Sequence, residues 1–118
     1  MLVRKENKII RKEAGFLGDV DDNWVYEITS AVLDIRRNQI KSLVNSLARK
    51  VMRGEDLSAE KLASSSVIDQ MIRDSLKEFS HSYYDGDMPI ISTATRKAAK
   101  KELAEEILAR VDKEVEGL

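Results

Sequence analysis

The stretch NWVYEITSAVLDIRRNQIKSLVNSLARKVMR, residues 23–53, decides the fold class of this chain. Its apolar residues recur at steps of three, four and five positions, the spacing of one helix face, and they are Ile28, Val32, Ile35, Ile40, Leu43, Leu47 and Val51. No proline or glycine interrupts the stretch before Gly54. A continuous helix over residues 23–53 would be about 46 Å long. That is long for a small domain, so we expect this helix to be bent or shared with a partner subunit.

The rest of the chain is also predicted to be helical. A short basic helix is expected at 3–14, and a further helical element is expected between Ser58 and Tyr83. A last helix is expected to start at Ser92 or Thr93. With one proline and five glycines in 118 residues, the chain has few helix breakers. We therefore predict an all-α bundle of about four helices, forming a single domain over the whole chain and completed by oligomerisation.

Short polar side chains stand where helices are predicted to begin. Asp21 or Asp22 can cap the helix of 23–53, and Ser58 can cap the element that follows it. Three consecutive serines then interrupt that element, and Ser66 and Asp69 are spaced like a capping box. These residues predict where the helices start more sharply than the apolar pattern does.

Composition excludes several classes of function. The chain has no cysteine, which removes disulfides and thiolate metal sites. His81 is its single histidine, and no nucleophile motif or phosphate-binding glycine loop is present. We therefore predict no catalytic residue, no metal site and no cofactor. No apolar run is long enough for a signal peptide or a membrane span, so we expect a cytoplasmic protein without a membrane partner.

Charge is distributed in blocks although the net charge is only −1. Residues 36–53 carry six Lys or Arg side chains and no carboxylate. The polar face of this block offers side chains that can contact phosphates and bases, and the candidates are Arg37, Lys41, Asn45, Arg49 and Arg53. The alternative is a solvated face, because cations in the C-terminal half of a helix are stabilised by its dipole.

The last helix has the opposite charge order to the one that its dipole favours. Cations stand near its start and most of its carboxylates near its end. A bound anion at the start would remove the conflict, and the candidate ligands are Ser92, Thr93, Thr95, Arg96, Lys97 and Lys100. An antiparallel partner helix with the same gradient, as in a two-fold symmetric dimer, would also remove it. The pattern favours pairing over anion binding.

These observations favour a protein that works by binding. The leading hypothesis is a non-enzymatic regulatory or adaptor protein that acts through protein–protein contacts as a homo-oligomer. Its candidate oligomer contacts come from the apolar face of 23–53 and are Ile28, Val32, Ile35, Leu43 and Leu47. The alternative is a nucleic-acid-binding protein that uses the basic faces at 36–53 and 92–101. The sequence leaves both hypotheses open.

Overall fold

A computed structural model describes residues 20–83 and 91–117, and within these ranges the protein consists of helices without any strand. The all-α prediction is confirmed. The described helices are α1 (Asp22–Ile35), α2 (Arg37–Met52), α3 (Ala59–Ala63), α4 (Ser66–Tyr83) and α5 (Thr93–Glu116). The predicted helix at 3–14 lies outside the described residues, and the one-domain organisation stays a prediction.

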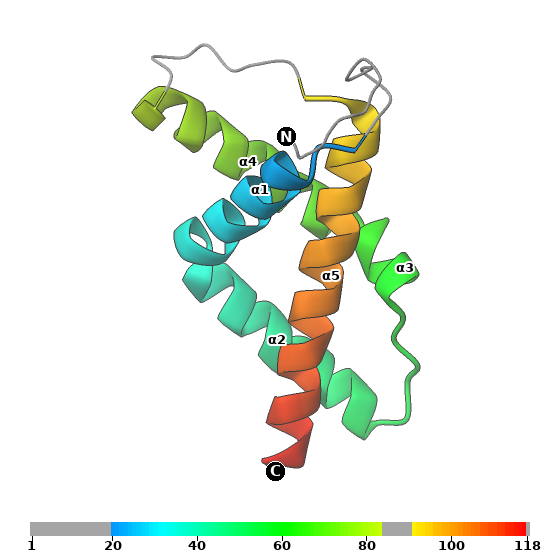
Figure 1. Cartoon of the computed structure of the whole chain (residues 1–118). Helices are drawn as coiled ribbons and strands as arrows, with labels where there is room; N and C mark the ends of the chain where they lie inside the picture. The colour runs from blue at the N-terminus through cyan, green and yellow to red at the C-terminus, as the bar shows by residue number, and fades with distance from the viewer. Residues whose placement is uncertain (1–19, 84–90, 118) are drawn as a thin grey trace.

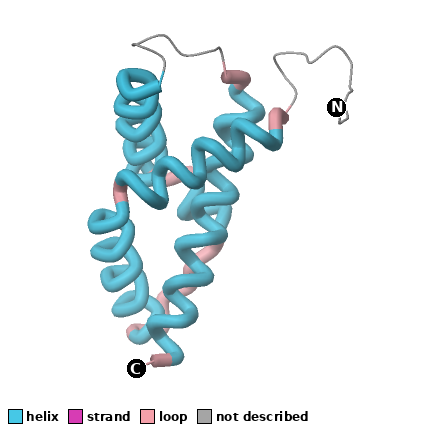
Figure 2. The backbone as a smooth tube through the Cα atoms, turned by 60° about the vertical axis from the view of Figure 1, so that its left-hand side comes forward, coloured by secondary structure: helices cyan, strands magenta, loops and turns pink. Residues whose placement is uncertain are grey.

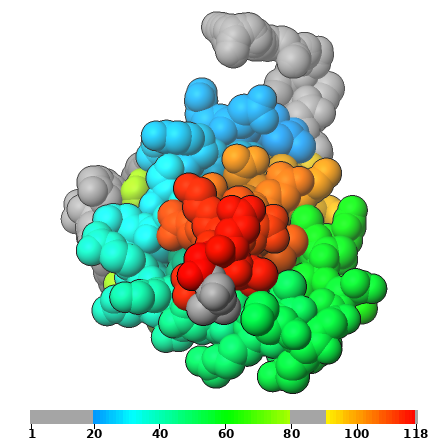
Figure 3. All heavy atoms as spheres, turned by 90° about the horizontal axis from the view of Figure 1, so that it is seen from below, coloured from blue at the N-terminus to red at the C-terminus, as the bar shows by residue number. Residues whose placement is uncertain are grey.

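Helix α5 is the centre of the fold. It runs along the length of the molecule and contacts each of the other four helices (Figure 1). Seen end-on, its C-terminal residues lie between the start of α2 and the segment that leads from α2 to α3 (Figure 3). Its buried side chains are Thr95, Ala99, Leu103, Ala104, Ile107 and Val111. The alanines among them allow neighbouring helices to approach, while each fully buried aliphatic side chain contributes about 1.5–3 kcal/mol.

The prediction of one continuous helix over 23–53 is wrong. The chain turns at Arg36, where φ is −104° and ψ is 30°, and α1 and α2 meet there at a sharp bend (Figure 2). Backbone hydrogen bonding continues through the junction, because the Arg36 N–H donates to the Val32 carbonyl at 2.8 Å. The Arg36 carbonyl in turn accepts from the Ile40 N–H at 2.9 Å. The expected bend is therefore a true change of direction between two helices.

The charge of Arg36 stands at the bend, where it has a partner. It lies four residues after the buried Val32 and four before the buried Ile40, so a straight helix would carry its guanidinium along the buried face. Burying an unpaired charge is costly. At the bend the guanidinium instead forms an ion pair with Glu78 of α4, and its side chain keeps 26% of its surface exposed. The two helices can then cover different parts of the core.

The predicted helix caps are largely confirmed. Asp21 caps α1 by accepting from the N–H groups of Asn23 at 3.0 Å and Trp24 at 3.2 Å. Ser58 caps α3, and Ser92 caps α5. The serine run does separate two helices, but the Ile68 N–H donates to the hydroxyl of Ser65. Ser66 is the first residue of α4, so the cap lies one residue before the one expected.

The core joins all the long helices. Helix α4 contributes Ile68, Met71, Ile72 and Leu76, which are buried with the apolar residues of α1, α2 and α5. Trp24 of α1 packs edge-to-face on Phe79 of α4, with ring centroids 6.4 Å apart. Such a ring pair adds about 0.5–1.5 kcal/mol beyond the burial of its surface. It fixes the crossing of α1 and α4.

Candidate binding surfaces

The basic residues of α2 lie on a face that no other described helix covers. Lys41, Arg49 and Lys50 are exposed and have no carboxylate partner in the described parts of the chain. Ion pairs occur only at the two ends of the helix. There Arg37 lies 3.4 Å from Asp34, and Arg53 lies 3.2 Å from Glu55.

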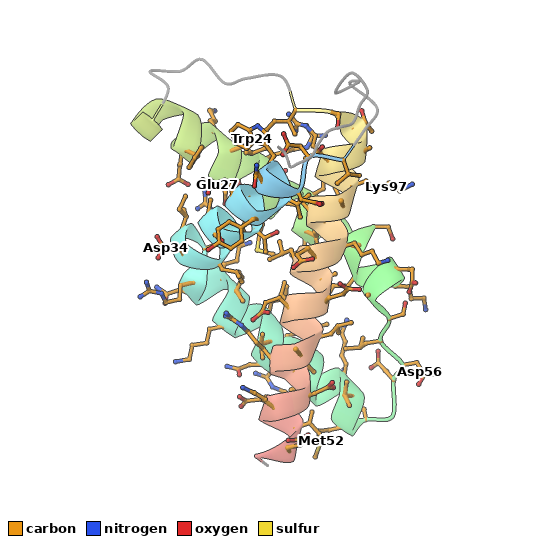
Figure 4. All side chains as sticks on the ribbon, viewed as in Figure 1. Trp24, Glu27, Asp34, Met52, Asp56 and Lys97 are labelled. Atoms are coloured by element: carbon orange, nitrogen blue, oxygen red, sulfur yellow. The ribbon has the colours of Figure 1, made fainter. Side chains whose placement is uncertain are left out.

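Arg37, Lys41, Arg49 and Arg53 make a cationic strip along the outside of α2, and Lys50 flanks it, about half a turn of helix away from Lys41. Asn45 is half-buried beside the strip, and Asn38 and Gln39 are exposed next to its first turn. The structure thus brings the five candidates of 36–53 to one side of α2. Asp34 marks the end of α1 from which the strip begins, and Met52 lies at its other end, near the C-terminal end of α5 (Figure 4).

The candidate anion ligands at the start of α5 are not arranged as an open site. Thr95 is 1% exposed, and its hydroxyl accepts from the Asp21 N–H at 2.9 Å. The hydroxyl of Ser92 accepts from the Thr95 N–H at 3.1 Å and lies 2.8 Å from the Thr95 hydroxyl. Two of the three expected hydroxyl ligands are therefore occupied by the fold, and only Thr93 is exposed.

The cations of α5 divide into a paired group and an exposed group. Lys100 forms a 2.8 Å ion pair with Asp69 near the start of α4. Hydrogen bonds from Lys100 and then from Arg73 hold the pKa of Asp69 below its usual value of 3.8. Arg96 and Lys97 are exposed and have no ion pair within residues 20–83 and 91–117. Part of the reversed charge gradient is thus compensated inside the molecule.

Most of the candidate oligomer contacts belong to the chain's own core. Ile28 and Val32 are buried in the core, and Leu47 is 7% exposed at a groove described below. Their predicted role rested on one long helix with an apolar face wider than a small bundle could cover, and the structure has two helices there instead. Ile35 remains 37% exposed, and Leu43 is half-buried against the core.

Sequence reasoning missed an apolar groove between α2, α3 and α5. It has a volume of about 160 Å³, is partly open to solvent, and is lined by Leu47, Leu57, Ser58, Lys61, Leu62 and Leu108. Its lining is almost entirely apolar. Leu57 comes from the connection between α2 and α3, so no periodic pattern in one helix could have indicated it. In the structure, the groove is marked by the half-buried side chains of Leu57, Leu62 and Leu108.

No described part of the chain shows the ligands of a metal centre. Within residues 20–83 and 91–117, no cluster of three or more His, Cys, Asp or Glu side chains could hold a metal ion. The His81 side chain lies outside the described residues. In the same ranges, no helix combines the length and the apolar character that crossing a membrane requires.

The fold and its surfaces define a small all-α protein with an apolar groove and a cationic strip in its described part. The chain matches no protein-family model, and no significantly similar curated sequence or solved structure is found. Its function is therefore argued from these two surfaces.

Proposed function

We propose that this protein is a non-enzymatic adaptor or regulatory protein that binds another protein through the groove between α2, α3 and α5. The observation that carries the proposal is the groove itself, an apolar lining that the chain leaves partly open to solvent. Leaving leucine side chains in contact with water costs about 25 cal/mol per Å² of apolar surface. A partner that covers them recovers this free energy.

The size of the groove favours a side chain over a small molecule as its ligand. Small-molecule and cofactor sites usually measure about 300–1,000 Å³, and this groove measures about 160 Å³. An apolar cavity of about 150 Å³ holds one benzene molecule. The groove therefore fits a single Leu, Met or Phe side chain, the kind of anchor that dominates protein–protein interfaces.

The polar groups at the groove favour binding over catalysis. Ser58 and Lys61 are the two polar residues in its lining. The Ser58 hydroxyl accepts from the Lys61 N–H at 3.2 Å as the cap of α3, so it has a structural role. Lys61 is exposed and has no carboxylate partner among the described residues. It suits an acidic residue next to the partner's apolar anchor.

Benzene tests the groove directly, because it imitates a phenylalanine side chain. We expect millimolar benzene to shift the leucine methyl resonances of Leu57, Leu62 and Leu108 in the full chain. The buried methyl groups of Leu103, on the inner face of α5, serve as the internal control. Equal shifts at all leucines, or no shift at the groove, would mean that the groove does not accept an apolar group.

Affinity purification from the natural host cells tests the adaptor role. We compare the tagged wild-type chain with Leu57→Glu and Lys61→Glu, both at the groove, and with Met52→Glu. Met52 is 60% exposed and lies outside the groove lining, so its variant is the matched control. A partner that the wild type and Met52→Glu retain and both groove variants lose supports the proposal. Retention by the groove variants refutes it, provided that circular dichroism shows them folded.

Light scattering identifies the case in which the partner is a second copy. One argument for self-association was an over-long helix, and the structure has two separate helices there. The other was the charge order of the last helix, which Asp69 compensates in part. Because we assign the groove to a different protein, we expect a monomer at micromolar concentration. A dimer that dissociates on Leu57→Glu would instead assign the groove to a second copy of this chain.

A further inference from the structure

The cationic strip of α2 differs from an ordinary solvated helix face. Helix α2 contains no acidic residue, and its exposed positions are polar except at Met52, the last residue of the helix. Solvated helices commonly alternate charges of opposite sign, which form pairs between neighbouring turns. This helix has no such pair within its own length. Its positive charges are thus left uncompensated by α2 itself.

The helix dipole accounts for only part of the strip. Arg49 and Lys50 stand in the last turn, where the dipole stabilises positive charge. Arg37 stands in the first turn, where the dipole opposes positive charge, and Lys41 stands in the second, where the dipole gives it no stabilisation. Since both halves of α2 are basic, a ligand that offers negative charge along the whole helix explains the strip better than the dipole does.

The chemistry of the strip favours a nucleic acid over an acidic protein. Protein–protein interfaces are centred on apolar or aromatic anchors and are depleted in lysine. The exposed positions of α2 before Met52 carry no apolar side chain, and they offer guanidinium, ammonium, amide and hydroxyl groups. Protein–DNA interfaces are more polar and more positive than protein–protein interfaces. The same side-chain types contact phosphates and base edges.

A duplex fits the strip better than a single strand does. Single-strand binding depends on aromatic side chains that stack on unpaired bases, and α2 contains no aromatic residue. The helix spans about 24 Å with cations in its first and last turns. The major groove of B-DNA, about 12 Å wide, admits an α-helix, whereas the major groove of an RNA duplex is too narrow.

We propose that the outer face of α2 binds duplex DNA, mainly through its phosphates, with Lys41 and Arg49 as the central contacts. Arg37 and Arg53 add two further contacts. To bind a phosphate, Arg37 gives up its exposed ion pair with Asp34, and Arg53 gives up its exposed ion pair with Glu55. Such exposed pairs are worth only about 0–1 kcal/mol. The inference does not depend on the groove, because it rests on a different surface.

Fluorescence anisotropy with a labelled 24-base-pair DNA tests the proposal on the full chain. Two to four phosphate contacts predict a slope of log K against log salt between about −2 and −4. The dissociation constant should lie in the micromolar range near physiological salt, as for non-specific binding. Single-stranded DNA and an RNA duplex of the same length serve as competitors. We expect both to compete less well than the DNA duplex.

Two matched double variants locate the binding surface. Lys41→Ala with Arg49→Ala removes two strip contacts, so it should reduce the magnitude of the salt slope by about 2 and weaken binding on the order of 100-fold at 50 mM salt. Lys97→Ala with Lys101→Ala removes the same charge from exposed positions of α5. Lys97 points away from α2 (Figure 4), so this control should change the affinity less than threefold.

Several outcomes overturn the inference. Absence of binding by the wild type at 50 mM salt would leave an acidic protein as the remaining ligand for the strip. Equal losses in the two double variants would mean that binding follows net charge and not α2. Stronger binding of single-stranded DNA or of the RNA duplex would refute the assignment to duplex DNA. Circular dichroism spectra and melting temperatures of both variants confirm that they are folded.

Discussion

Thr95 joins the beginnings of α1 and α5, and Thr95→Val tests this role. Valine has nearly the same shape as threonine but offers no acceptor to the Asp21 N–H, which donates to Thr95 at 2.9 Å across 74 positions of sequence. The substitution also removes the 2.8 Å contact with the Ser92 hydroxyl. A buried donor left without its acceptor costs about 1–3 kcal/mol. We therefore expect the free energy of unfolding to fall by about 2 kcal/mol.

Urea unfolding followed by circular dichroism measures the effect. With a slope of about 2 kcal/mol per molar urea, the midpoint should fall by about 1 M. Thr93→Val is the matched control, because Thr93 is exposed two residues earlier in the same helix turn and should change stability by less than about 0.5 kcal/mol. Equal midpoints for the two variants would refute the structural role of Thr95. A phosphate-dependent stabilisation that only Thr95→Val abolishes would restore the anion-binding interpretation of this helix start.

Two further substitutions test charges that the fold holds in place. Arg36→Met keeps the side-chain stem but removes a buried Nε that has no hydrogen-bond partner among the described residues. Burying that unpaired Nε costs about 1–3 kcal/mol, whereas a half-exposed ion pair with Glu78 contributes only about 0–1 kcal/mol. Urea unfolding of Arg36→Met should therefore show a free energy of unfolding that is unchanged or raised by up to about 2 kcal/mol. A loss above about 1 kcal/mol would contradict this prediction. Hydrogen bonds from Lys100 and then Arg73 lower the pKa of Asp69 in the folded protein. The ionised Asp69 side chain therefore stabilises the fold above pH 3.8, and this stabilisation is lost as the pH falls through the lower pKa of the folded state. In a melting-temperature titration, Asp69→Asn should therefore lie below the wild type at pH 6 and converge with it toward pH 2; a constant difference would contradict the assignment.

The features that could be predicted from the sequence are those decided by neighbouring residues. Capping by Asp21, Ser58 and Ser92 requires only a short polar side chain before a helical run, so these helix starts were predictable. The all-α class follows from periodicity in the same way. At the bend, Arg36 contacts Glu78, which lies 42 positions away in sequence, and no local pattern contains that partner. A charged residue on an otherwise apolar face was the one available sign.

The candidate surfaces also differ in how far the sequence predicts them, depending on whether their residues are neighbours in sequence. The acid-free character of α2 is a property of one continuous segment, so the cationic strip could be predicted. The groove is assembled from Leu47, Leu57, Leu62 and Leu108, which belong to separate elements. Their proximity is set by how α2, α3 and α5 pack. The Thr95 hydroxyl was predicted as an anion ligand because the sequence does not reveal its partner. That partner, the Asp21 N–H, lies 74 positions away.

The basic residues of α2 and those at the start of α5 differ in how far the fold compensates their charge. In α5, unfavourable dipole interactions of about 0.3–1 kcal/mol per charge are outweighed by burial of its aliphatic side chains, each contributing about 1.5–3 kcal/mol. The core thus fixes the direction of α5, and Asp69 compensates Lys100. Its reversed charge order therefore requires no ligand. Lys41 and Arg49 of α2 receive no such compensation from the described residues, although α2 also buries Ile40, Val44 and Leu47. Among the described residues, α2 is the helix whose unpaired cations are accompanied by no acidic residue, so the search for an anionic partner begins there and not at the start of α5.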